Sequence, residues 1–289
     1  MKNNFNYIVP IFNKEDILPQ TLEGIENCAG TDSKIIMIVD GCTDRSEAIV
    51  DEFMKNSAHK TEKILMPNVH MLLSVNAGLK TVKGGFSVIM QDDIVLKDTD
   101  TEKKVIDLYQ KKKEKLGVIS FRYGADLKGT SFKSTISINR NVKWNNKSIV
   151  EKTMSNFNQM IETINMIQSP DDNASYPIAE NGTFHQRMCA INGPNVVPWA
   201  LLSKIGLLDE GIAPYGYDDP DYSLRSLKAG FINGLFPIKY ISEEGWSGSS
   251  RSEEFKQNAQ RIITKSRIYV WQKHKRFIKE YNKMMNNGY

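Results

Sequence analysis

The sequence has few cysteines and no long hydrophobic run. Its three cysteines, Cys28, Cys42 and Cys189, lie far apart and form no Cys-x-x-Cys pair. A disulfide framework or a zinc site is therefore not expected, and reduced thiols fit a cytoplasmic setting. No segment approaches the ~20 apolar residues of a membrane-spanning helix, and residues 1–6 lack the apolar run of a signal peptide. These absences predict a cytoplasmic protein.

The sequence also lacks a strong charge of either sign and a glycine-rich loop near its start. Its 38 Lys and Arg residues against 34 Asp and Glu residues give a formal net charge of +4. This balance is far from the basic stripe of a nucleic-acid-binding protein, so no nucleic-acid partner is expected. No Gly-x-Gly-x-x-Gly motif follows the first apolar run, which disfavours a dehydrogenase that binds a dinucleotide.

What the sequence does contain, over its first hundred residues, is an alternation of two patterns. Short apolar runs predict strands at 7–11, 35–39, 63–66 and 86–90. Apolar residues at helical spacing predict helices at 16–28, 46–54 and 74–82. Strands that alternate with helices favour a doubly wound, mostly parallel α/β sheet. The chain of 289 residues, 40% of them hydrophobic, is long enough to bury a sizeable core.

The second half of the chain is less regular. The polar stretch 128–187 is expected to hold loops. Shorter elements are expected as a strand at 116–121 and helices near 148–167, 205–209 and 219–229. From residue 254 onward the sequence is basic and helical in pattern. The sequence therefore predicts an α/β fold followed by a C-terminal helical extension.

Polar residues gather where three of the predicted strands end. These residues are Asn13 and Glu15, which follow Pro10, then Asp40, then Asp92 and Asp93. Ligands of open α/β sheets bind outside the carboxyl ends of the strands, so we expect the side chains to share one crevice. Carboxylates that converge repel one another unless a cation or a ligand hydroxyl stabilises them, and Mg²⁺ and Mn²⁺ prefer such oxygen ligands. The plainer alternative for each acid is a turn or a helix cap.

Four motifs follow one another along the chain. They are the strand ends at 9–15 and 40–44, the segment from Asn76-Ala77-Gly78 to Asp92-Asp93, and a late acidic segment. The late segment joins Gly206 to Glu210 with the turn Asp218-Asp219-Pro220-Asp221. In this order, these motifs resemble those of the inverting, GT-A-type glycosyltransferases of family 2. The resemblance covers about residues 5–250 and implies a GT-A-like fold.

The resemblance also implies roles for individual residues. The protein would transfer a hexosyl or related sugar from a nucleotide-diphosphate donor to an acceptor hydroxyl with inversion, in polysaccharide or glycan biosynthesis. Donor-binding residues would be Pro10, Asn13, Glu15, Asp40, Asn76 and Asp92, with Asp40 on the base and Asp92 on the ribose. Asp93 would bind the divalent cofactor, Mn²⁺ or Mg²⁺. Asp219 would be the general base, with Asp218 as the competing candidate. The acceptor, a glycan, a lipid-linked molecule or a protein, stays open.

The sequence departs from the family pattern at several positions. Asn68 lacks the glycine that usually follows two residues later, and Ser74-Val75 stands where a basic residue often precedes Asn76. Glu243-Glu244 stand where many relatives have a His. These departures keep open a non-catalytic relative that binds a nucleotide sugar or a partner. A sugar-nucleotide-forming nucleotidyltransferase is a second alternative, although residues 10–15 lack the glycine-rich loop typical of such enzymes.

The domain organisation expected from these motifs is a GT-A-like domain at 1–250 and a basic helical extension at 251–289. The donor-binding half is expected at about 1–125 and the acceptor and catalytic half at about 126–250. In the extension, basic residues alternate with apolar ones such as Trp271 and Ile278. Such a helix can lie on an anionic membrane, so peripheral contact with the inner face of the membrane is one expectation. The alternative is a helix packed on the domain with a solvated basic face.

Overall fold

A computed structural model describes residues 4–127, 135–139, 178–242 and 253–286. Its centre is a sheet of β1 (Phe5–Ile11), β2 (Lys34–Asp40), β3 (Lys60–Met66), β4 (Phe86–Ile89), β6 (Leu116–Ser120), β10 (His185–Gln186), β12 (Asn195–Pro198) and β13 (Ile232–Leu235). The strand order is β10-β13-β6-β12-β4-β1-β2-β3. Strands β10 and β12 run antiparallel to their neighbours, and every other pairing is parallel. The carboxyl ends of β1, β2, β4 and β6 therefore lie along one edge.

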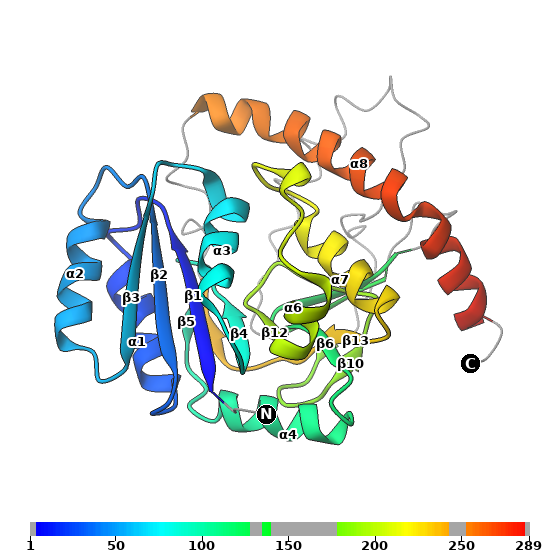
Figure 1. Ribbon diagram of the computed structural model, residues 1–289, viewed down its shortest axis with the longest axis horizontal. Helices are drawn as coiled ribbons and strands as arrows, with labels where there is room; N and C mark the ends of the chain where they lie inside the picture. Colours follow the sequence, from blue (N-terminus) through cyan, green and yellow to red (C-terminus); the bar gives the residue numbers. More distant parts are fainter. Residues whose placement is uncertain (1–3, 128–134, 140–177, 243–252, 287–289) are drawn as a thin grey trace.

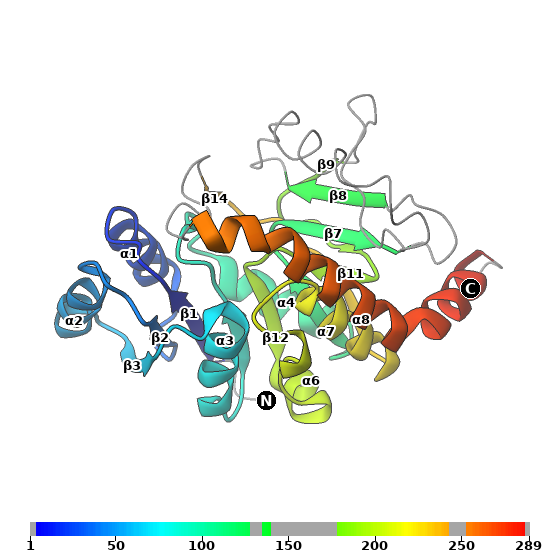
Figure 2. The same ribbon diagram turned by 90° about the horizontal axis from the view of Figure 1, so that it is seen from above.

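Helices cover both faces of this sheet (Figures 1 and 2). They are α1 (Leu18–Cys28), α2 (Ser46–Asn56), α3 (His70–Thr81), α4 (Thr101–Lys111), α6 (Trp199–Ile205), α7 (Asp218–Lys228) and α8 (Glu253–Asn286), with the short 3-10 helix η2 (Glu210–Ile212) before α7. Alternate residues of a strand point to opposite faces. In β1, Ile8 packs in a core with α3, α6, α7 and α8, whereas Tyr7 and Val9 pack in a second core with α1, α2 and α4.

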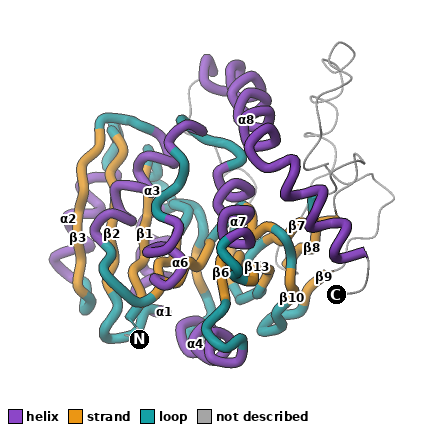
Figure 3. The backbone as a smooth tube through the Cα atoms, turned by 45° about the vertical axis from the view of Figure 1, so that its right-hand side comes forward, coloured by secondary structure: helices purple, strands orange, loops and turns teal. Residues whose placement is uncertain are grey.

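Two smaller sheets accompany the central one, and Figure 3 shows β7, β8 and β9 of the larger of them. The strands β11 (Cys189–Ile191), β7 (Tyr123–Asp126), β8 (Thr135–Asn139) and β9 (Ile178–Ala179) form a four-stranded sheet in that order, and β14 (Tyr240–Ile241) pairs with β5 (Val95–Leu96). Strand β7 follows β6 almost directly, and β11 precedes β12 by a short turn. The four-stranded sheet is therefore anchored beside the carboxyl ends of β4 and β6.

The predicted α/β class, the mostly parallel sheet and the C-terminal helix are confirmed. The helix predicted at 205–209 is wrong, because α6 ends at Ile205, where Gly206 takes a φ of 75° that stops the helix. Helix α4 at Thr101–Lys111 was not predicted. The helix expected near 148–167 lies outside the described residues.

The C-terminal helix α8 packs on the rest of the protein. Its Val270, Trp271 and Ile278 are buried in the core that also contains α7. Figure 1 shows α8 crossing the molecule from above α3 to beyond α7. Its exposed large apolar side chains, among those described, are Tyr269, Met284 and Met285. No helix in the described ranges is both long and apolar enough to span a bilayer.

Candidate active site

The loops that follow β1 and β2 are tied to each other at the sheet edge. The backbone N–H of Thr43 donates to Asn13 Oδ1 at 2.8 Å, and Asn13 Nδ2 donates to Thr43 Oγ1 at 3.2 Å. The Glu15 carboxylate accepts from the backbone N–H of Arg45 at 3.0 Å. Pro10 is buried within β1, paired with Ile38. Hydrogen bonds therefore join the two predicted donor-binding loops.

Asp40 is the last residue of β2 and is buried under the loop that follows β3. Its Oδ1 accepts a 2.6 Å hydrogen bond from the Val69 backbone N–H. Gly41, at a φ of +65°, lets this loop approach, since a Cβ there would lie 2.6 Å from the Asn68 nitrogen. Within the described part of the chain, Oδ2 of Asp40 has no hydrogen-bond partner. That oxygen can accept a hydrogen bond from a ligand.

Asp92 and Asp93 follow β4, next to β1. Asp92 Oδ2 accepts from the Phe12 backbone N–H at 3.0 Å, which joins the ends of the two strands. The Asp93 carboxylate lies 3.9 Å from the Lys14 ammonium, and both side chains are nearly buried. The sequence patterns did not single out Lys14, although it lies between Asn13 and Glu15 in a motif that they did.

A divalent metal fits this turn only together with further ligands. The described residues hold no cluster of three or more His, Cys, Asp or Glu that could ligate a metal. Mg²⁺ commonly binds one or two carboxylates, several waters and the phosphates of a substrate, and Asp93 suits that mode. Glu243 and Glu244, the candidates for a late ligand, lie outside the described residues.

Arg122 is a cation at the same edge that sequence reasoning missed. Its Nη1 donates to Gln91 Oε1 at 3.3 Å, and Gln91 directly precedes Asp92. The guanidinium carbon also lies 5.1 Å from the centre of the Tyr123 ring. No carboxylate of the described residues forms an ion pair with Arg122. Its position after β6 is the signal that could have found it, since strand ends line the crevice.

Asp219 reaches this edge from the start of α7. Its Oδ1 accepts from Asn195 Nδ2 at 2.8 Å and its Oδ2 from the Asn192 backbone N–H at 2.7 Å. Asn195 is almost completely buried and pairs with Ile89 of β4 and Ser120 of β6. The sheet itself therefore positions the predicted base.

The electrostatic surroundings of Asp219 favour the protonated acid. Burial, and then the neighbouring Asp218 carboxylate, raise the pKa of Asp219, and the hydrogen bonds from Asn192 and Asn195 oppose them. Burial also raises the pKa of Asp218, whose Oδ1 accepts from the Gly216 backbone N–H. A raised pKa makes a carboxylate a stronger base, which suits proton abstraction.

Asn76 occupies a different kind of position. Its Oδ1 accepts from the Leu208 backbone N–H and its Nδ2 donates to the Leu208 carbonyl, both at 3.0 Å, and the side chain is buried. The oxygen and the nitrogen of the Asn76 side-chain amide therefore both hold the loop that leads towards α7. This is a structural role, and the contacts give no support to the predicted donor contact, which stays a prediction.

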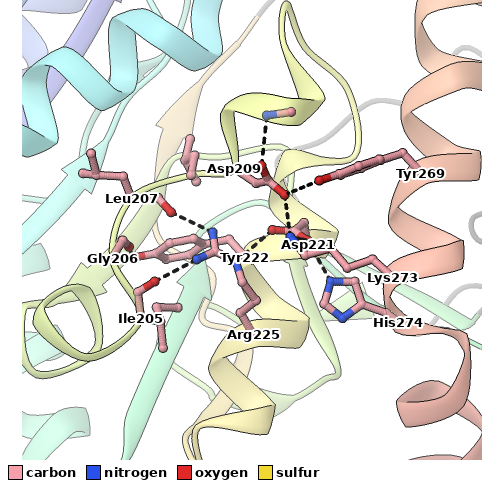
Figure 4. A network of polar contacts seen from close by, with 12 residues as sticks. Ile205, Gly206, Leu207, Asp209, Asp221, Tyr222, Arg225, Tyr269, Lys273 and His274 are labelled. Atoms are coloured by element: carbon pink, nitrogen blue, oxygen red, sulfur yellow. Dashed lines mark hydrogen bonds and ion pairs between the residues drawn. The ribbon is translucent and has the colours of Figure 1, made fainter.

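Behind the predicted base lies a network of charged residues, drawn in Figure 4. Asp221 is fully buried and accepts hydrogen bonds from Arg225, Lys273 and His274 at 2.7–2.8 Å. Burial alone would raise the pKa of Asp221, but these donors, led by His274, outweigh it and lower the pKa to about 2. Asp221 is therefore a permanent anion that joins α7 to α8.

Solved structures of other proteins share this fold. TarS residues 1–349 from S. aureus, in complex with UDP-GlcNAc, has a TM-score of 0.52 at 15% identity and covers 90% of this chain. Mannosyltransferase PcManGT from Pyrobaculum calidifontis, in complex with GDP-Man and Mn²⁺, has a TM-score of 0.54 at 14% identity over 96% of this chain. These are GT-A-type glycosyltransferases, so the predicted GT-A-like fold is confirmed. The chain spans 65% of that TarS fragment, 72% of PcManGT and 39% of the longer TarS chain.

The family of the chain follows from its sequence. None of the curated proteins matches the chain. The family model described as glycosyl transferase family 2 matches residues 7–181, which is more than half of the chain. The matched stretch contains every predicted donor and metal residue, from Pro10 to Asp93, and Asp219 lies beyond it. The chain belongs to glycosyl transferase family 2.

Proposed function

We propose that the protein transfers a sugar from a nucleoside diphosphate donor to an acceptor hydroxyl, with inversion at the anomeric carbon and with the help of a divalent metal. The observation that carries the proposal is the arrangement of Asp40, Asp93 and Asp219 along one edge of a mostly parallel sheet. Family membership supports the same reaction class. Residues 1–125 would bind the donor and residues 126–250 the acceptor.

The nucleoside would lie between the ends of β1 and β2. Asp40 Oδ2 would accept a hydrogen bond from the base, with Pro10, Asn13 and Glu15 around it. Asp92, whose Oδ2 accepts from the Phe12 backbone N–H, would contact the ribose. TarS and PcManGT were solved with a uridine and a guanosine donor respectively, and both bases carry N–H groups that a carboxylate can bind.

The diphosphate would lie beside Asp93, Lys14 and Arg122. Asp93 would hold Mn²⁺ or Mg²⁺, which would act as a Lewis acid on the diphosphate oxygens. Lys14 sits close enough to neutralise Asp93 when no metal is bound. Arg122 would place a positive charge where negative charge develops on the departing diphosphate. In this role it would replace the basic residue that the sequence lacks before Asn76.

Asp219 would act as the general base. Its carboxylate would take the proton of the acceptor hydroxyl while the hydroxyl oxygen forms a bond to the anomeric carbon. The bond from that carbon to the diphosphate oxygen would break, and the diphosphate would leave with the electron pair. A direct displacement of this kind inverts the anomeric configuration. The acceptor would be a glycan, a lipid-linked molecule or a protein.

The proposal is tested by thermal shift with a panel of nucleoside diphosphates, each with and without Mn²⁺. A ligand at about 100 times its Kd stabilises the native state by about 2.7 kcal/mol, so one diphosphate should raise the Tm by several degrees. We expect Mn²⁺ to enlarge that shift in the parent and not in Asp93→Asn. A panel in which no diphosphate moves the Tm contradicts the proposal.

Turnover then separates the enzyme from the non-catalytic alternative. A protein that only binds a nucleotide sugar would show the Tm shift but would not release diphosphate from the sugar donor. We expect slow, Mn²⁺-dependent hydrolysis of the donor by water even when the acceptor is unknown. The sugar nucleotide that supports hydrolysis would also identify the base and the sugar.

A further inference from the structure

The loop that leads to the predicted base is held at both ends by one side chain of α8. The Lys273 ammonium lies 2.6 Å from Asp209 Oδ2 and 2.7 Å from Asp221 Oδ1 (Figure 4). Asp209 begins η2, where its other oxygen accepts from the Gly211 N–H. Asp221 lies in the first turn of α7, two residues after Asp219. Lys273 therefore links the two ends of the segment 209–221. It does so from α8, which lies outside the sheet.

The two ends of this bridge differ in burial. The Asp221 side chain is 1% exposed, whereas that of Asp209 is 23% exposed. A buried carboxylate that loses a partner is left uncompensated, which is far more costly than leaving it paired. Arg225 and His274 share Asp221 with Lys273, whereas Asp209 has Lys273 and the Tyr269 hydroxyl. The bridge can therefore be cut at Asp209 without exposing an unpaired charge in the core.

Further contacts of α8 follow the same loop. Ser266 Oγ donates to the Ile212 carbonyl at 3.4 Å and lies 3.3 Å from the Tyr215 carbonyl. A Cβ at Gly216 would lie 3.4 Å from the Ile263 side chain, an ordinary van der Waals contact, so α8 also packs beside this part of the loop. The helix thus contacts the beginning, middle and end of the segment that carries Asp218 and Asp219.

We propose that α8 is part of the catalytic unit and that Lys273 is a positioning residue for Asp219. The inference rests on the proposed function, in which Asp219 is the base. Asn192 and Asn195 fix the carboxylate from the sheet side, and Lys273 fixes the backbone that carries it from the helix side. A displacement of about 1 Å can cost on the order of 100-fold in rate, so a base needs both supports.

The test compares three variants of the full chain with the parent. Lys273→Met removes the bridge, Lys273→Arg keeps the charge and can still contact two carboxylates, and Lys275→Met alters an exposed lysine of the same helix. We expect Lys273→Met to lower kcat at least ~10-fold with a donor Kd within about 2-fold of the parent, because the base does not touch the donor. Lys273→Arg should restore most of the turnover, and Lys275→Met should match the parent.

Asp209→Asn is a further variant that cuts the same link at its other partner. It is needed because Lys273→Met could unfold the protein. Asparagine keeps an oxygen for the Gly211 N–H and leaves the Asp221 pair intact, so the fold should survive while the link between the loop ends weakens. We expect lower turnover in the same direction, with faster amide hydrogen exchange in residues 209–219 than in the parent. Unchanged exchange and unchanged kcat in Asp209→Asn and Lys273→Met would overturn the inference.

The outcome also distinguishes this inference from the proposed function. If the parent and Lys273→Met bind and hydrolyse the donor equally well, the inference about Lys273 is wrong and the proposed function still stands. A parent that binds no nucleoside diphosphate removes the proposed function and with it the catalytic role of Lys273. In that case, hydrogen exchange in Lys273→Met against Lys275→Met still decides whether the lysine orders the loop.

Discussion

At the scale of single residues, the candidate site separates side chains that ligands can reach from side chains that the fold already uses. Asp40 and Asp93 each keep an oxygen available. In contrast, the amide of Asn76 is hydrogen-bonded to Leu208, and the buried carboxylate of Asp221 already contacts three donors. Residue type alone does not make this distinction, because Asp219 and Asp221 are the same amino acid two positions apart. What differs is the surroundings of each carboxylate. Burial and the Asp218 carboxylate raise the pKa of Asp219. Hydrogen bonds from His274 and Lys273 outweigh burial and lower the pKa of Asp221.

The residue-scale prediction concerns Asp219. A general base contributes about 10²–10⁴ in rate, so Asp219→Asn should lower kcat by that factor. Donor affinity measured by calorimetry should stay near that of the parent, because the base contacts the acceptor. The pKa of Asp219 is raised, and the ionised base is lost as the pH falls through its pKa. The kcat of the parent should therefore decline at a higher pH than a base with the ordinary pKa of Asp would give.

Asp218→Asn is the matched control for this prediction. Its carboxylate accepts from Gly216 and not from the sheet, so its loss should cost less turnover. The substitution also removes the charge that helps raise the pKa of Asp219, so the decline of kcat should move to lower pH. If Asp219→Asn keeps a normal rate and Asp218→Asn has a low rate, Asp218 and not Asp219 is the base.

At the scale of elements, the first half of the fold is readable from the sequence and much of the second half is not. The strands β1, β2 and β4 are mostly apolar because they are buried on both faces, and such runs are easy to find. The edge strand β3 is only partly buried, and its sequence pattern revealed only its apolar end at 63–66. Strands β10, β11 and β14 are two or three residues long and form only through long-range pairing, for example Gln186 with Gly234. Arg122 and Lys273 were missed as site residues for the same reason, since their partners are distant in the sequence.

The element-scale prediction concerns the docking of α8 and pH. Burial lowers the pKa of His274, whose Nε2 lies 2.7 Å from Asp221 Oδ1. The unfolded chain therefore binds a proton at His274 more readily than the folded chain, so stability is lost as pH falls below the ordinary value of about 6.5. Lys228 and Lys273 also face His274, and Arg225 shares Asp221 with it. Asp221 stays ionised between pH 7 and 5 because its pKa is about 2.

His274→Gln tests this prediction, because Gln can still donate to Asp221 and does not titrate. Each unit of pKa difference between the two states is worth about 1.4 kcal/mol, so the parent should lose more stability than the variant between pH 7 and 5. Urea unfolding at several pH values measures the difference. Parallel curves for the two proteins would mean that His274 does not govern the docking of α8.

At the scale of the whole molecule, charge is distributed unevenly around α8. Its apolar side chains Val270, Trp271 and Ile278 are buried, so they are not available to enter a bilayer. The exposed side of the helix carries several basic residues, namely Arg261, Lys265, Lys275, Arg276, Lys279 and Lys283. Any contact with a membrane would therefore be electrostatic, with Met284 and Met285 as the exposed apolar residues near its end. Deleting the helix is not a clean test of such contact, because deletion would open the core.

The whole-molecule prediction uses surface substitutions instead. A basic residue near an anionic membrane contributes about 1 kcal/mol of attraction, so changing Lys275, Lys279 and Lys283 to Gln should weaken binding to phosphatidylserine vesicles on the order of 100-fold. The parent should pellet with these vesicles at low salt, should be released as salt screens the charges, and should ignore neutral phosphatidylcholine vesicles. The triple variant should keep the Tm and the turnover of the parent, because the three lysines are exposed and, among the described residues, form no hydrogen bond or ion pair with the loop 209–221. A parent that stays in the supernatant with anionic vesicles at low salt would leave the basic face as a solvated surface.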